Sequence, residues 1–76
     1  MFKEIVNDVL FKLNALDRRI IKKRFGIGLP YEMSIQEIAD SENITINKVK
    51  YSLSSSFKQI KNYIKPEDLK SLYESL

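Results

Sequence analysis

Apolar residues recur every three or four positions along most of this chain, which is the period of an amphipathic α-helix. The pattern predicts a helix over residues 2–13 and a second helix from a cap at Asn14 to a left-handed stop at Gly26. A short closing helix is expected from Pro66, because proline suits the first helical position. The sequence therefore predicts an all-α fold of four to five helices in a single domain that spans residues 1–76.

Residues 34–62 carry the signals of a helix-turn-helix. Ser34 and Glu37 have the spacing of a capping box, in which each side chain accepts a hydrogen bond from the other residue's backbone N–H. Ala39 is small enough for the close approach of two helices, and Asn43 tolerates the left-handed conformation expected in the turn. Each signal is weak alone, but their joint spacing favours a helix-turn-helix.

The second helix of this unit is expected to begin at about Ile46, after an N-cap at Thr45, and to run toward Tyr63. Its apolar residues define one buried stripe: Val49, Leu53, Phe57, Ile60 and Ile64. The opposite side presents Asn47 and Tyr51 in the first two turns. Ile46 falls on the buried side of the helical wheel, so it is either a core residue or, if it turns outward, a contact to a thymine methyl group.

Basic residues gather in two groups around this unit, and the formal net charge of the chain is +3. One group lies in the helix predicted from Asn14 to Gly26, and the other lies in the second helix of the helix-turn-helix. A solvated helix face is the alternative for either group, but two groups beside a helix-turn-helix favour phosphate contacts. The expected contacts to the DNA backbone are Thr45, Lys48, Lys50, Lys58, Arg18, Arg19 and Lys22.

Composition argues against several classes of function. The 76 residues include no Cys and no His, so the usual zinc ligands, the thiol nucleophile and the commonest general base are missing. Neither enzymatic activity nor a cofactor is expected. Two carboxylate pairs, Glu4 with Asp8 and Glu37 with Asp40, are weak metal patterns that are more often a solvated helix face. No apolar run is long enough to span a bilayer, and a cytoplasmic protein is expected.

Two stretches, LNALDRRIIKKRFGIG and SIQEIADSENITINKVKYSLSSSFKQIK, resemble region 4 of the primary bacterial sigma factors. In that family a helix of the form LxxRExxVLxxRFG precedes TLEEIGxxFxVTRERIRQIExxALxKLR. Arg24, Phe25 and Gly26 match the family's RFG. Ten residues match the helix-turn-helix pattern in type: Ser34, Ile35, Glu37, Ile38, Ile44, Thr45, Val49, Lys50, Phe57 and Ile60.

The resemblance implies recognition of a promoter −35 element in the DNA major groove and docking on the flap of the RNA polymerase β subunit. Ile46 and Asn47 stand where the family has Arg-Glu, and Tyr51 stands where it has Gln. Leu16 replaces an Arg that is expected to contact phosphate. The expected base-reading residues are therefore Asn47, Tyr51 and Ile46, whose chemistry favours an A·T-rich site.

The polymerase contact is expected on apolar faces of the first and last helices, formed by Phe2, Ile5, Val9, Leu69, Leu72 and Tyr73. The alternative is that both faces simply close a small core. Because 76 residues cannot also hold the region that melts a promoter, three forms are expected. The chain is a piece of a longer sigma factor, a partner of a separate chain carrying region 2, or a phage protein that redirects polymerase. A module that binds polymerase or a sigma partner without reading DNA, and a dimeric transcriptional regulator, are alternatives.

Overall fold

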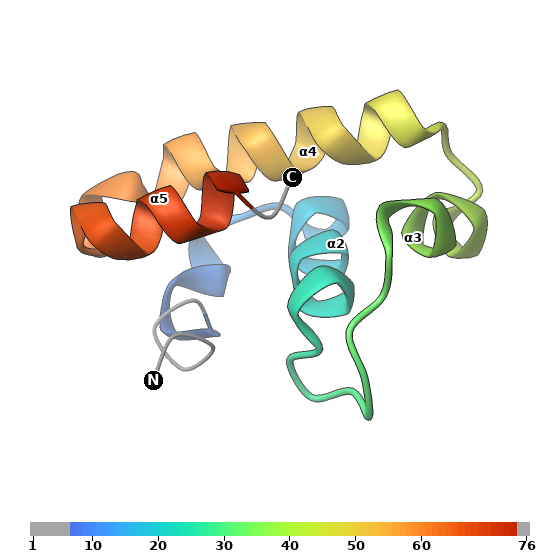
Figure 1. Cartoon of the computed structure of the whole chain (residues 1–76), viewed down its shortest axis with the longest axis horizontal. Coiled ribbons are helices and arrows are strands. Elements are labelled where there is room, and N and C mark those ends of the chain that lie inside the picture. Colours follow the sequence, from blue (N-terminus) through green and yellow to red (C-terminus); the bar gives the residue numbers. More distant parts are fainter. Residues whose placement is uncertain (1–6, 75–76) are drawn as a thin grey trace.

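The computed structural model describes residues 7–74, and all of their regular structure is helical (Figure 1). In chain order the elements are the 3₁₀ helix η1 (Leu10–Lys12), α2 (Ala15–Phe25), α3 (Ile35–Glu42), α4 (Ile46–Ile60), the 3₁₀ helix η2 (Lys61–Tyr63) and α5 (Pro66–Glu74). The described residues contain no β-strand. The predicted all-α fold is confirmed.

Local sequence sets both ends of α2 as predicted. The Asn14 side chain accepts a hydrogen bond from the Asp17 backbone N–H at 2.8 Å, which caps the first turn. At the other end Gly26 is left-handed, with φ 68° and ψ 28°. A β-carbon at Gly26 would approach the Glu32 backbone nitrogen to 3.3 Å and would be strained at this φ. Glycine therefore ends α2 and lets the chain turn into the loop.

Helix α4 is the element against which the others pack. It lies across α2 and α3 and also contacts η2 and α5 (Figure 1). The predicted stripe of Val49, Leu53, Phe57 and Ile60 is fully buried, and Ile64, which follows η2, is half-buried. One continuous face of α4 thus serves three neighbouring helices.

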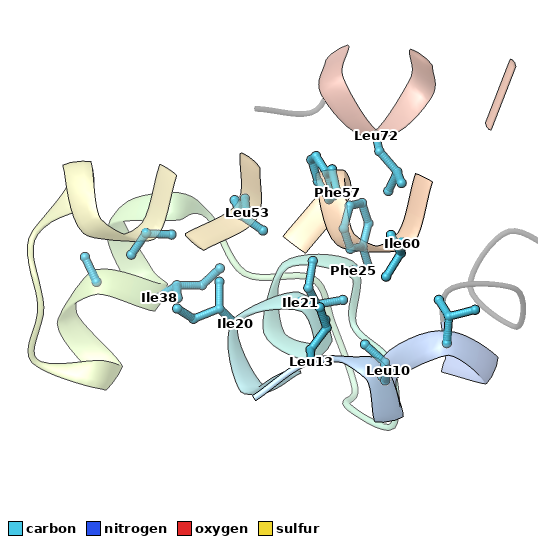
Figure 2. Close-up of a cluster of buried hydrophobic side chains, with 13 residues drawn as sticks. Leu10, Leu13, Ile20, Ile21, Phe25, Ile38, Leu53, Phe57, Ile60 and Leu72 are labelled. Atoms are coloured by element: carbon cyan, nitrogen blue, oxygen red, sulfur yellow. The ribbon is translucent and has the colours of Figure 1, made fainter. Parts of the chain in front are cut away.

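The apolar core fills the space between α4 and the helices around it (Figure 2). Phe57 lies near its centre, with ring centroids 6.3 Å from that of Phe25 and 5.3 Å, edge-on, from that of Tyr73. Such tilted and edge-on ring pairs add to the free energy of area burial. The buried apolar residues are Val9, Leu10, Leu13, Ile20, Ile21, Phe25, Ile38, Ala39, Val49, Leu53, Phe57, Ile60 and Leu72.

The helix predicted over residues 2–13 is not a continuous α-helix where it is described. Residues 7–9 are helical, but the chain then tightens into η1, and Leu13 is extended with φ −101° and ψ 155°. Asn14 must itself be extended to cap α2, so the preceding helix has to end before it. Phe2 and Ile5, two of the predicted partner contacts, lie outside the described residues.

Helix α4 is also shorter than predicted, because it ends at Ile60 and not near Tyr63. The chain continues as the 3₁₀ helix η2 and becomes extended at Ile64, with φ −130° and ψ 157°. Pro66 begins α5, and a proline disfavours the helical conformation in the residue before it. The break between the two helices therefore follows from a proline whose role as a helix start was predicted correctly.

A buried polar contact joins α2 to α4. The Ser52 hydroxyl donates a hydrogen bond to the Asp17 carboxylate at 2.5 Å, and the two residues are 2% and 8% exposed. Asp17 lies in the first turn of α2, where the helix dipole favours a negative charge. Because a hydrogen bond depends on direction as well as distance, this contact fixes how α4 is rotated against α2.

Ser52→Ala should lower the free energy of unfolding by about 1–3 kcal/mol, because the buried Asp17 carboxylate loses a hydrogen bond that water cannot replace. Urea denaturation followed by circular dichroism measures the change. Ser54→Ala is the matched control, since Ser54 is only partly buried on the same helix and alanine is the better helix former. Equal destabilisation by both substitutions would contradict a specific role for the Asp17–Ser52 contact.

Candidate nucleic-acid interface

The turn between α3 and α4 has the cap and turn geometry that the sequence predicts. Ser34 Oγ accepts from the Glu37 N–H at 3.1 Å and Glu37 Oε1 accepts from the Ser34 N–H at 2.9 Å, which completes the capping box of α3. Asn43 ends α3 in the left-handed conformation, with φ 56° and ψ 46°. Thr45 Oγ1 then accepts from the Lys48 N–H at 3.0 Å and begins α4. These contacts fix where α4 starts.

Burial of Val49 and Leu53 determines which side of α4 faces solvent. Asn47 is exposed, and 68% of the Tyr51 surface is accessible. At 100° per residue, Asn47, Tyr51 and Lys58 fall on one line along the helix, with Lys58 about 16 Å beyond Asn47 at 1.5 Å per residue. The side of α4 that carries the predicted base contacts is therefore open.

Ile46 is more exposed than its position on the helical wheel indicates. It shares the angular position of Leu53 and Phe57, yet 38% of its surface is accessible while theirs is fully buried. Helical side chains lean toward the N-terminus, so the first residue of a helix leans past the end of its own packing surface. Of the two interpretations of Ile46, the one that leaves it available to a ligand agrees with this exposure.

The open side of α4 combines amide, aromatic and ammonium groups. The Lys48 ammonium lies 5.7 Å from the centroid of the Tyr51 ring, within the range of a cation–π contact. Lys50 and Lys58 are also exposed. Asn47 can donate and accept at once, which is the pattern that the major-groove edge of adenine requires. Chemically, this side offers an amide able to pair with a base edge and ammonium groups able to pair with phosphates.

The basic residues of α2 do not form one open face. Arg18 is half-buried and its Nη2 donates to the Leu13 carbonyl at 3.0 Å, while its buried Nε has no hydrogen-bond partner among the described residues. Arg19 and Lys23 both bind the carboxylate of Glu42, and Lys22 is exposed. Arg18 and Arg19, two of the predicted phosphate contacts, are thus engaged in contacts within the protein.

Glu42 connects α3 to α2, and sequence reasoning missed it. Its carboxylate accepts from Arg19 Nη2 at 3.1 Å and from Lys23 Nζ at 2.6 Å, and only 8% of the Glu42 side chain is exposed. These hydrogen bonds, first to Arg19 and then to Lys23, lower the pKa of Glu42 below its ordinary value of 4.5. A carboxylate in the last turn of a helix is disfavoured by the helix dipole, and that was the available signal for a distant cationic partner.

The residues predicted to contact a partner protein are divided by the structure. Val9 and Leu72 are 8% and 0% exposed, so both belong to the core and neither forms an accessible partner surface. Leu69 is half-buried, and Tyr73, although 38% exposed, packs its ring against Phe57. The alternative interpretation, closure of a small core by the first and last helices, holds for Val9 and Leu72.

The carboxylates set aside as weak metal patterns have other roles where they are described. Glu37 completes the capping box, and Asp40 accepts from Gln36 Nε2 at 3.0 Å. No group of three or more His, Cys, Asp or Glu side chains suited to a metal ion occurs within residues 7–74. Glu4 lies outside the described residues. Over the same range, no helix has the length and apolar character needed to cross a membrane.

Neither protein-family models nor solved structures assign the chain to a family. No protein-family model matches the sequence, and no solved structure matches the fold.

Glu42→Gln should lower the stability of the protein by about 1 kcal/mol at neutral pH, a value kept small because Arg19 is half-exposed and solvent screens the pair. The pKa of Glu42 is lower in the folded state than in the unfolded state. Its contribution is therefore fully present above the unfolded pKa and is lost as the pH falls through the folded pKa. The stabilities of wild type and Glu42→Gln should therefore converge as the pH falls, and thermal unfolding of both proteins from pH 7 down to pH about 3 measures this.

Asp40→Asn is the control, since Asp40 is an exposed carboxylate on the same helix that bonds only locally to Gln36 in the described hydrogen-bond network. A difference between wild type and Glu42→Gln that stayed constant down to acid pH would contradict an ionic role for Glu42.

Proposed function

We propose that this chain is a promoter-binding domain similar to sigma factor region 4, in which α4 enters the major groove of a −35-type DNA element. The observation that carries the proposal is the orientation of α4. Its core stripe is fully buried while Ile46, Asn47 and Tyr51 are exposed together in the first two turns. In a helix-turn-helix, these turns of the second helix meet base edges.

The chemistry of the open side favours A·T base pairs. Asn47 can accept from adenine N6 and donate to adenine N7, a pairing that no other base offers in the same arrangement. Ile46 offers an aliphatic side chain to a thymine methyl group, and the Tyr51 ring can do the same or donate its hydroxyl to a phosphate. None of the three is an arginine, the usual partner of guanine.

Phosphate contacts are assigned chiefly to α4. Lys48, Lys50 and Lys58 are exposed along the helix, and the Thr45 hydroxyl lies at its start. Backbone contacts of this kind position a helix on DNA and carry no sequence information. Lys22 remains a further candidate, whereas the internal contacts of Arg18 and Arg19 reduce what they can offer to DNA.

The proposed setting is transcription initiation in a bacterial or phage-infected cell, with the domain docked on the RNA polymerase β flap. The same docking would place it beside a sigma chain that carries region 2. A domain that occupies polymerase or a sigma partner without reading DNA is the competing function, and the absence of the family's Arg-Glu pair before Lys48 favours it. The experiments below separate the two.

Asn47→Ala should cost about 1–3 kcal/mol of binding free energy on the preferred DNA site and little on random DNA, because one bidentate base contact is lost. Binding-site selection first identifies the site, and fluorescence anisotropy at fixed salt measures the affinities. Gln59→Ala is the control, since Gln59 is an exposed amide at the other end of α4. Enrichment of G·C-rich sites, or an unchanged preference after Asn47→Ala, would show that the base contacts are wrongly assigned.

Lys48→Gln should weaken binding to all DNA sequences alike and reduce the slope of log affinity against log salt by about 0.9, the value for one neutralised phosphate. Anisotropy titrations at several salt concentrations give this slope. Lys65→Gln removes the same charge between η2 and α5, away from the start of α4, and should leave the slope unchanged. A wild-type affinity that does not respond to salt would rule out phosphate-led binding and favour the competing function.

A further inference from the structure

A pocket beside α2 is lined by aliphatic side chains, here called its apolar floor, and by cationic side chains, here called its basic rim. Its volume is about 280 Å³, and it is lined by Arg19, Lys22, Lys23, Ile27, Gly28 and Leu29. Three of these side chains are cationic, two are aliphatic, and none is acidic. Ile27 is half-buried, and 42% of the Leu29 surface is accessible. The pocket therefore exposes apolar surface beside three cations, two of which pair with the Glu42 carboxylate.

A second apolar hollow shares one lining residue with this pocket. The second hollow has a volume of about 120 Å³ and is lined by Leu29, Pro30, Tyr31 and Met33. Leu29 therefore lines both hollows. Tyr31 is 63% exposed. The loop of residues 26–33 thus presents several neighbouring apolar side chains to solvent.

Backbone hydrogen bonds hold this loop against α2. The Ile27 N–H donates to the Lys22 carbonyl at 2.9 Å, and the Met33 N–H donates to the Lys23 carbonyl at 2.9 Å. The Leu29 N–H donates to the Gly26 carbonyl at 3.3 Å. Because the loop is tied to the helix at both of its ends, a ligand would not have to order the pocket as it binds.

We propose that this pocket docks an acidic, amphipathic segment of a partner protein, which places an aliphatic side chain on Ile27 and Leu29 and carboxylates near Lys22 and its basic neighbours. Charge complementarity selects the occupant. The apolar floor gives no benefit to a DNA phosphate, and the basic rim disfavours a basic or purely apolar segment. The surface is separate from the exposed side of α4, so this inference does not rest on the proposed DNA binding.

The basic rim divides into fixed and free charges. Arg19 and Lys23 form salt bridges with the Glu42 carboxylate, which hold their side chains beside the pocket. Lys22 is exposed on the same helix. A partner carboxylate can therefore approach Lys22 without breaking a contact to Glu42. For the same reason, a substitution of Lys22 tests the basic rim without disturbing the fold.

The experiment titrates a synthetic helical peptide into the full ¹⁵N-labelled chain and follows the backbone amide shifts. The peptide carries two Leu residues one helical turn apart, flanked by Glu, and a second peptide has Gln in place of every Glu. Saturable shifts are expected at Ile27, Gly28 and Leu29. The Gln peptide and the Lys22→Glu variant should each weaken binding about tenfold, because each removes or reverses a charge contact.

Two matched variants complete the test. Lys65→Glu makes the same charge reversal as Lys22→Glu at an exposed site between η2 and α5, and it should bind like wild type. Leu29→Ser should abolish saturation without altering thermal unfolding, since Leu29 is outside the buried core.

Three outcomes would overturn the proposal. They are the absence of any shift at millimolar peptide, equal binding of the Glu and Gln peptides, and shifts centred on the first turns of α4. A fourth would be the same pocket shifts produced by duplex DNA, because they would assign the basic rim to phosphate instead. A failure of DNA binding at Asn47 or Lys48 would leave the peptide result untouched.

Discussion

Burial of one face of α4 is the constraint on which the rest of this structure depends. Val49 and Leu53 seat the first half of the helix, and Phe57 seats the second half against Phe25 of α2 and Tyr73 of α5. A helix of period 3.6 residues cannot bury one stripe without exposing the opposite one. The exposure of Asn47 and Tyr51 is therefore a consequence of core packing, and any ligand of this face reads the side that the core does not use.

Two polar contacts fix helix orientations that apolar packing alone does not determine. Apolar burial is non-directional, so a smooth stripe permits α4 to rotate slightly on its neighbours. The Asp17–Ser52 hydrogen bond, between α2 and α4, sets that rotation. Glu42 at the end of α3 binds Arg19 and Lys23 of α2. Helix α2 thus positions both helices of the helix-turn-helix, α3 and α4. In a domain with so small a core, each such contact is a large share of the net stability.

The distribution of charge separates two surfaces that the sequence merges. Arg19 and Lys23 of α2 bind Glu42 and, with Lys22, line the pocket beside the loop of residues 26–33. The lysines of α4 accompany Asn47 and Tyr51. The proposed DNA contact would then use chiefly α4 and the proposed acidic partner α2, and Lys22 is a candidate for both.

The sequence by itself determined the features that depend on neighbouring residues. The caps at Asn14, Ser34 and Thr45, the left-handed Asn43 and the stripe of α4 are all local, because cap chemistry and helical period act within one or two turns. The open side of α4 followed from the same period, so the positions of the candidate base contacts Asn47 and Tyr51 were predictable.

Only the tertiary structure decided which distant groups meet. Ser52 reads as a poor helix former but satisfies Asp17 from across the core, and Arg19 reads as a free cation but is held by Glu42. The sequence left Val9 and Leu72 open to either a partner surface or the core, and they are buried, because the amount of apolar surface that a small core absorbs depends on how its helices close together. These partners are many residues apart in sequence, and no local period or cap encodes their approach.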